Sequence, residues 1–195
     1  SDLLITAFEF AIDKRELLGT VPLLKGLRRG KGEGDWIPPI YFVSASPSQM
    51  RGVLERKMLL DGVEPDGVTL KGQFSLLLKW GPSALRRQIG YKLGALFLYR
   101  LERPGGMSEV LFGDDSESDP FIYSLYRDVV QGDWTPQELD QQLALQGEPP
   151  EVRMALVELA GRIDPGPHVK DIFIQLTGKH SIPRKEEFPG VFFVL

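Results

Sequence analysis

The sequence predicts an α/β protein with a mainly parallel sheet. Segments with helical apolar periodicity alternate with short, strongly apolar runs, and these runs lack the strict alternation of a half-exposed strand. Such continuous runs are typical of parallel strands that helices cover on both faces. The chain has 195 residues, of which 42% are hydrophobic, which is enough to bury one sizeable core. We therefore expect a single domain over residues 1–195.

The first half of the chain is expected to contain helices, a strand and a small insertion. Leu3–Phe10 and Pro22–Leu27 have helical patterns, and Ile40–Val43 is predicted to be a buried strand. Asp61–Leu85 is irregular and is interpreted as an insertion. Its aromatic and basic side chains either pack under a loop or face phospholipid headgroups, and both interpretations stay open.

A serine-rich turn follows the strand that ends at Val43. Ser46 is expected to cap a helix that has Pro47 at its first position, with Gln49 completing a capping box. The N-terminus of a helix also favours anions, because its N–H groups are free and its dipole is positive. Ser46 is explained by capping, whereas Ser44 is not needed for the cap and is the better candidate for phosphate contact.

The second half is expected to alternate between helices and strands. Leu85–Tyr99 is predicted to be a helix in which Ile89, Leu93, Leu96 and Phe97 face the core and Lys92 lies among them. Val110–Phe112 is predicted to be a strand, and Ile172–Ile174 and Gly190–Leu195 are candidates for later strands of the same sheet. A further helix begins near Asp119, with Ile122, Leu125, Tyr126 and Val129 on its apolar face. These elements complete the expected α/β alternation.

The most informative feature is the acidic segment after Phe112. The apolar run stops at Gly113, and four carboxylates follow within six residues: Asp114, Asp115, Glu117 and Asp119. At the carboxyl end of a parallel strand, this density of carboxylates suits Mg²⁺, which binds one or two carboxylates together with water and phosphate oxygens. The alternative is an acidic turn in which Asp119 is the N-cap and Pro120 is the first helical residue. The pattern alone leaves both open.

Composition excludes several classes of function. The net charge of −4 argues against a nucleic-acid partner, and the absence of cysteine excludes disulfides, thiolate catalysis and cysteine zinc sites. Only two histidines are present, which leaves little for a serine triad or a histidine-rich metal site. No run is long enough to span a membrane and no signal-peptide pattern is seen, so we expect a cytoplasmic protein.

Three segments together resemble a known family. Tyr41–Pro47, Gly90–Lys92 and Phe112–Tyr123 are similar to the phosphatidate phosphatase domain of the actin-patch-associated family and its bacterial relatives, in the haloacid-dehalogenase-like (HAD-like) superfamily. Leu3–Glu9 also resembles the segment that follows this family's nucleophile loop, so the resemblance covers roughly residues 3–126. It implies a HAD-like, Rossmannoid three-layer sandwich with a mainly parallel central sheet.

The resemblance also implies a mechanism and roles for individual residues. In this family an Asp attacks phosphorus, and water then hydrolyses the aspartyl-phosphate with the help of Mg²⁺. Ser44 and Ser46 would contact the phosphoryl group, and Lys92 would neutralise its charge. Asp114 and Asp119 would hold the metal, supported by Asp115. The expected substrate is a phosphorylated small molecule or a phospholipid headgroup such as phosphatidate, with peripheral membrane attachment in the latter case.

The family's first motif, Asp-x-Asp-x-Thr, is not intact in this sequence. Asp2-Leu3-Leu4-Ile5-Thr6 fits it only with Leu4 in place of the second Asp, which makes Asp2 the candidate nucleophile. The other interpretation is that the motif is missing near residue 2. Two function classes follow: a Mg²⁺-dependent phosphatase, or a noncatalytic relative that binds a phosphorylated ligand or protein. The sequence does not predict the oligomeric state.

Overall fold

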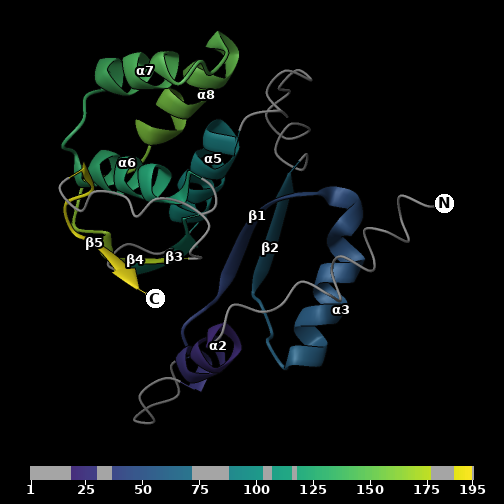
Figure 1. Ribbon diagram of the computed structural model, residues 1–195. Helices are drawn as coiled ribbons and strands as arrows, with labels where there is room; N and C mark the ends of the chain where they lie inside the picture. Colours follow the sequence, from purple (N-terminus) through teal and green to yellow (C-terminus); the bar gives the residue numbers. More distant parts are fainter. Residues whose placement is uncertain are drawn as a thin grey trace. The chain divides into compact units, whose positions relative to one another are not determined.

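The computed structural model describes residues 19–29, 37–71, 88–102, 107–115, 118–176 and 187–194. These belong to two compact units, Ser1–Gln73 and Phe74–Leu195, each of which is described by itself (Figure 1). Both contain helices and parallel strands, so the predicted α/β class is confirmed. The expectation of a single domain stays a prediction. The predicted helix at Leu3–Phe10 lies outside the described residues.

The first unit is built around a two-stranded parallel sheet. Its elements are helix α2 (Thr20–Arg29), strand β1 (Tyr41–Pro47), the short 3-10 helix η1 (Ser48–Met50), helix α3 (Arg51–Asp61) and strand β2 (Gly67–Lys71). Tyr41 lies opposite Gly67 and Ser44 opposite Leu70, and the register shifts between Ser44 and Pro47. Because parallel strands need a crossover connection, η1 and α3 return the chain to the start of β2.

Two predictions for the first unit are wrong. The strand continues to Pro47, and α3 begins only at Arg51 without a side-chain cap, so Ser46 and Gln49 form no capping box. The expected irregular insertion contains β2, in which Leu70 has no exposed surface. The segment Gly-Val-Thr-Leu-Lys has only two aliphatic side chains, Val68 and Leu70, which give little periodicity, and it is the pairing with β1 that makes this segment a strand. Residues 72–85 of the insertion lie outside the described part.

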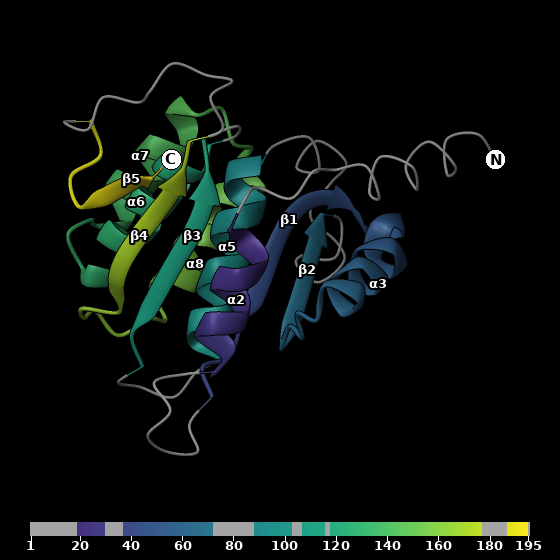
Figure 2. The same ribbon diagram turned by 60° about the horizontal axis from the view of Figure 1, so that its bottom comes forward.

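The second unit has a three-stranded parallel sheet in the order β3-β4-β5. Its elements are α5 (Gln88–Leu101), β3 (Glu109–Asp114), α6 (Asp119–Gln131), α7 (Pro136–Leu145), α8 (Pro150–Ala160), β4 (Val169–Gln175) and β5 (Val191–Val194). Leu111 lies opposite Ile172, which lies opposite Val191, so the three predicted strands are confirmed as neighbours in one sheet. The described helices of this unit lie on one face of the sheet (Figure 2).

The core lies between these helices and the inner face of the sheet. Phe97, Ile122 and Tyr126 have no exposed surface, and neither do Ile172 and Ile174 of β4. The rings of Phe97 and Tyr126 are 5.7 Å apart between centroids. Burying each large apolar side chain stabilises the fold by about 1.5–3 kcal/mol relative to leaving it exposed. The core-facing residues predicted for α5 and α6 are thereby confirmed in their main positions.

Burial on β3 differs from the prediction. Leu111 is 9% exposed, but Val110 and Phe112 on the opposite face are 41% and 38% exposed. The expectation of a strand buried on both faces is therefore wrong for the described residues. Phe112 stacks on Phe173, which stacks on Phe192, with centroid distances of 5.4 and 5.3 Å. These rings form a row across the three strands.

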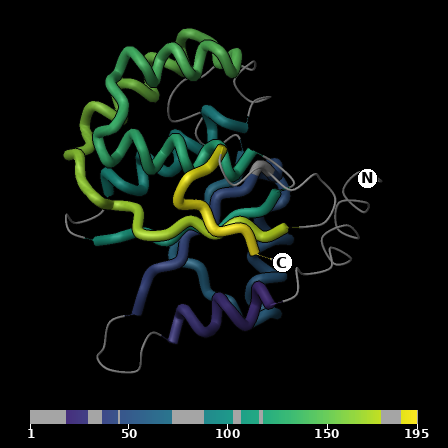
Figure 3. Tube along the Cα trace, turned by 60° about the vertical axis from the view of Figure 1, so that its left-hand side comes forward, coloured from purple at the N-terminus to yellow at the C-terminus, as the bar shows by residue number. Residues whose placement is uncertain are grey.

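The connection from β3 to β4 runs through α6, α7 and α8 (Figure 3). Ser118 is the N-cap of α6, so Asp119 is its first residue and not the predicted cap.

Helix α7 begins with a true capping box, in which Thr135 and Glu138 bond each other's backbone N–H groups. This exposed arrangement lowers the pKa of Glu138, since the Thr135 side chain and backbone both donate to the carboxylate.

Candidate functional site

The candidate site lies at the carboxyl end of β3. Asp114 is the last residue of the strand, Asp115 forms the turn, and Asp119 opens α6. The N–H of Asp115 donates to the carbonyl of Gln175 at 3.1 Å, so the pairing of β3 with β4 continues into the turn. Ligand sites in open α/β sheets form beyond the carboxyl ends of the strands. The backbone therefore places the acidic segment where such a site is expected.

A buried ion pair joins α5 to the start of α6. Nζ of Lys92 donates to Oδ1 of Asp119 at 2.5 Å, and the two side chains are only 6% and 9% exposed. This burial belongs to the whole helix segment, because residues 90–97 of α5 are all buried. Two charges removed from water are tolerated only when they are well paired. The structure thus brings together two of the predicted site residues across 27 positions of sequence.

Gly113 provides the space that this pair needs. A Cβ atom added at Gly113 would lie 2.7 Å from Oδ2 of Asp119 and 2.8 Å from Cε2 of Tyr123. Tyr123 in turn donates from its hydroxyl to the carbonyl of Phe112 at 3.2 Å. Any larger residue at position 113 would push against Asp119. Steric contact with Asp119 therefore explains why the Gly-Asp-Asp segment has a glycine at position 113.

The predicted magnesium ligands are not gathered into one cluster. Within the described part of the chain, no group of three or more carboxylates or histidines is arranged to hold a metal. Asp119 faces Lys92, and Asp115 is buried in the turn with 8% exposure. Asp114 ends the strand and is partly exposed. One or two carboxylates completed by water and phosphate oxygens fit Mg²⁺, so the donor set at Asp114 and Asp119 is compatible with the predicted ion.

Ser44 and Ser46 belong to the first unit. The N–H of Ser46 donates to Oγ of Ser44 at 3.2 Å, and the Ser44 hydroxyl donates to Oγ of Ser46 at 3.0 Å. A serine that accepts a bond from the N–H two residues on closes a small turn. Both hydroxyls therefore stabilise the end of β1, and their proposed phosphate contacts stay predictions. Asp2 lies outside the described residues.

Glu148 is a buried acidic residue near the candidate site that sequence reasoning missed. It follows α7 and is only 4% exposed, and its Oε1 accepts a bond from the N–H of Gly90 at 3.0 Å. Gly90 belongs to the first turn of α5, 58 residues earlier. Nothing local in the sequence indicates this contact, because the partner is distant and the glutamate stands next to prolines that suggest only a turn.

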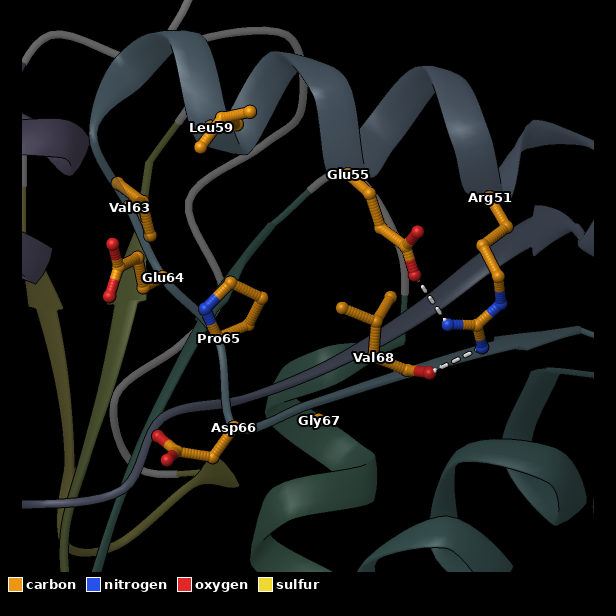
Figure 4. A pocket seen from close by; sticks show the side chains of 9 residues that line it. All are labelled: Arg51, Glu55, Leu59, Val63, Glu64, Pro65, Asp66, Gly67 and Val68. Carbon is orange, nitrogen blue, oxygen red and sulfur yellow. Dashed lines mark hydrogen bonds and ion pairs between the residues drawn. The ribbon is translucent and has the colours of Figure 1, made fainter.

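The first unit contains an open hollow of about 490 Å³ between α3 and the start of β2 (Figure 4). Arg51 crosses one side of it, with Nη1 2.7 Å from Oε1 of Glu55 and Nη2 donating to the carbonyl of Val68 at 2.7 Å. Val63, Pro65 and Asp66 line other parts of it. None of the predicted site residues that the structure describes lines the hollow, and the guanidinium of Arg51 is already bonded to Glu55 and Val68.

Asp66 pins helix α2 to the strands of the first unit. It forms an ion pair with Arg28 and accepts a bond from the N–H of Ile40 at 2.8 Å. Partial burial acts to raise the pKa of Asp66, but the bonds from Arg28 and Ile40 together outweigh it, so the pKa lies below its usual value. Arg28 and Ile40 both belong to the first unit, so we interpret this contact as one that stabilises the fold of that unit.

No family model, curated protein or solved structure matches this chain. The likeness to HAD-like phosphatases therefore rests on the sequence segments alone. None of the helices in the described ranges is long and apolar enough to cross a membrane.

Proposed function

We propose that this protein is a Mg²⁺-dependent phosphatase with a HAD-like three-layer fold, acting on a phosphomonoester such as phosphatidate. The observation that carries the proposal is the buried pair of Lys92 and Asp119 at the carboxyl end of β3, beside Asp114. An ammonium kept in a desolvated place is strongly attracted to a phosphoryl group that enters it. A carboxylate at the strand end is the other requirement, since it can bind a divalent cation.

The roles of the residues follow from this arrangement. A carboxylate oxygen attacks phosphorus while the bond from phosphorus to the ester oxygen breaks, and the departing alkoxide takes a proton from water to leave as the alcohol. Water then attacks the aspartyl-phosphate, releasing phosphate and restoring the carboxylate. Lys92 offsets negative charge on the phosphoryl oxygens, and Asp119 keeps the ammonium oriented. Mg²⁺, held by Asp114 and Asp119, would supply charge compensation. Asp2 is the only nucleophile candidate that the resemblance indicates.

A second candidate function is binding without catalysis. It is favoured by the first motif, in which Leu4 stands where the family has its second Asp. In that case Lys92 would still attract a phosphorylated ligand, but no aspartyl-phosphate would form. Turnover and binding therefore have to be measured separately.

The test is phosphate release from p-nitrophenyl phosphate and from phosphatidate in vesicles, with MgCl₂ or with a chelator. We expect release that needs Mg²⁺ and that falls at least about a hundredfold in Asp114→Asn, because electrostatic groups in such sites contribute several kcal/mol. Asp133→Asn is the control, since Asp133 is an exposed carboxylate of the same unit. Activity that persists with chelator, or in Asp114→Asn, would contradict the metal assignment. Saturable binding of inorganic phosphate without turnover would favour the binding protein.

A further inference from the structure

We propose that Glu148 is a positioning residue for Lys92, acting through the first turn of α5. The inference rests on the proposed function only for the role of Lys92. The positioning itself follows from contacts within the second unit, where the connection between α7 and α8 reaches the start of α5.

The backbone around Glu148 is fixed on both sides. Gly147 has φ of 74°, and it ends α7 with two bonds, from its own N–H to the carbonyl of Ala144 at 2.8 Å and from the Glu148 N–H to the carbonyl of Leu143 at 2.9 Å. This pair of hydrogen bonds is a Schellman motif, which needs the left-handed conformation that glycine adopts without strain. Helix α8 then begins at Pro150. Glu148 is thus held between two helix ends.

The carboxylate of Glu148 completes the N-terminus of α5. The first N–H groups of a helix have no partner within the helix, and a carboxylate near them is favoured by the helix dipole. Oε1 of Glu148 accepts from the N–H of Gly90 at 3.0 Å, in a place that is 4% exposed. A charge-assisted bond in such a place is about twice as strong as a neutral one.

The fit between the two segments is tight. A Cβ atom at Gly90 would lie 2.7 Å from Cγ1 of Val152 and 2.9 Å from Oε2 of Glu148. Only glycine lets α5 approach Glu148 and α8 this closely. Lys92 follows Gly90 by two residues, about 3 Å further along the helix axis. A shift or fraying of the first turn would therefore move Lys92 against Asp119.

The experiment follows Lys92 directly by NMR of the protein labelled with ¹³C and ¹⁵N in lysine, with the Lys92 signal assigned by its loss in Lys92→Arg, and a second sample labelled with ¹⁵N in glycine reports the amide of Gly90. Glu148→Ala should shift this signal and raise amide exchange of Gly90 at least about tenfold. Glu148→Gln, which keeps an acceptor oxygen, should stay close to the wild type. Gly90→Ala should shift the Lys92 signal as Glu148→Ala does, because its methyl group displaces the carboxylate without removing it. Glu148→Gln and Gly90→Ala still test the inference if Glu148→Ala does not fold.

Glu109→Gln is the matched control, because Glu109 is also a buried carboxylate of this unit but bonds Arg100 and Tyr126 at the other end of β3. It should leave the Lys92 signal unchanged. An unmoved Lys92 signal in folded Glu148→Ala and Gly90→Ala, or an equal shift in Glu109→Gln, would overturn the inference.

A kinetic readout separates this inference from the proposed function. If the wild type releases phosphate, Glu148→Ala should lower kcat about tenfold or more with little change in KM, and Glu148→Gln should restore most of it, since small misplacements of catalytic groups cost up to about a hundredfold. If the wild type releases none, the proposed function fails while the NMR measurement still decides the positioning role.

Discussion

A Cβ atom at Gly113 would lie 2.7 Å from Oδ2 and 2.8 Å from Cβ of Asp119, so the strand and the first residue of α6 are in direct contact. The absence of a side chain at the end of β3 is what allows Asp119 to lie within the core, where Lys92 reaches it. This steric relationship connects the acidic segment of the sequence with the buried ion pair, and the first prediction follows from it.

Gly113→Ala should displace Asp119 and destabilise the protein by about 1–3 kcal/mol, the usual cost of forcing extra volume into a packed site. Chemical unfolding measures the stability, and the NMR signal of Lys92 reports the displacement. Gly161→Ala is the matched control, because an added Cβ there meets nothing closer than 3.4 Å. Equal stability of Gly113→Ala and the wild type would show that Asp119 can move without cost.

Breaking the pair of Lys92 and Asp119 should cost more than replacing it. Lys92→Met removes the ammonium that faces the buried Asp119 carboxylate, and Asp119→Asn removes the negative charge that faces the buried ammonium, so each should destabilise the fold by about 3–5 kcal/mol. The double variant should lose clearly less than the sum of the two single losses, since the residues are in direct contact. Urea unfolding of the four proteins gives this coupling energy. Additive losses would argue against an energetically coupled pair.

Tyr126→Phe should destabilise the second unit without changing the candidate site. The Tyr126 hydroxyl donates to Oε2 of Glu109 at 2.6 Å in a buried place, and its removal should cost about 1–3 kcal/mol. Arg100 still bonds Oε1 at 3.2 Å, so the carboxylate keeps a partner. The Lys92 signal should be unchanged. A shifted Lys92 signal would reveal coupling between the two ends of β3.

The contact between Arg28 and Asp66 should make the first unit more sensitive to acid. The pKa of Asp66 is lowered in the folded protein, so its stabilising effect is present above the unfolded value of about 3.9 and is lost as the pH falls through the folded pKa. The two side chains are 31% and 33% exposed, which limits the effect to about 1 kcal/mol. Unfolding of the wild type and Asp66→Asn between pH 7 and pH 3 measures it. The difference should shrink towards acid pH, and a constant difference would contradict the assignment.

Local pattern determined much of the fold. Periodic apolar positions predicted α5 and α6, and short apolar runs predicted the strands at Val110, Ile172 and Val191. Both patterns involve only residues that are close together in the sequence. Strand β2 was missed, since its identity depends on pairing with β1 and not on its own five residues. The start of α3 was placed too early, because the bond between Ser44 and Ser46 competes with capping.

For the candidate site, the sequence by itself determined which residues carry the chemistry: a lysine within an apolar helix and carboxylates directly after a strand. Only the tertiary structure decided that Lys92 pairs with Asp119, that Gly113 leaves room for this pair, and that Glu148 caps the helix that carries the lysine. The physical reason is distance along the chain. Propensity and periodicity act over a few residues, whereas the partners of a buried charge are set by which elements pack together.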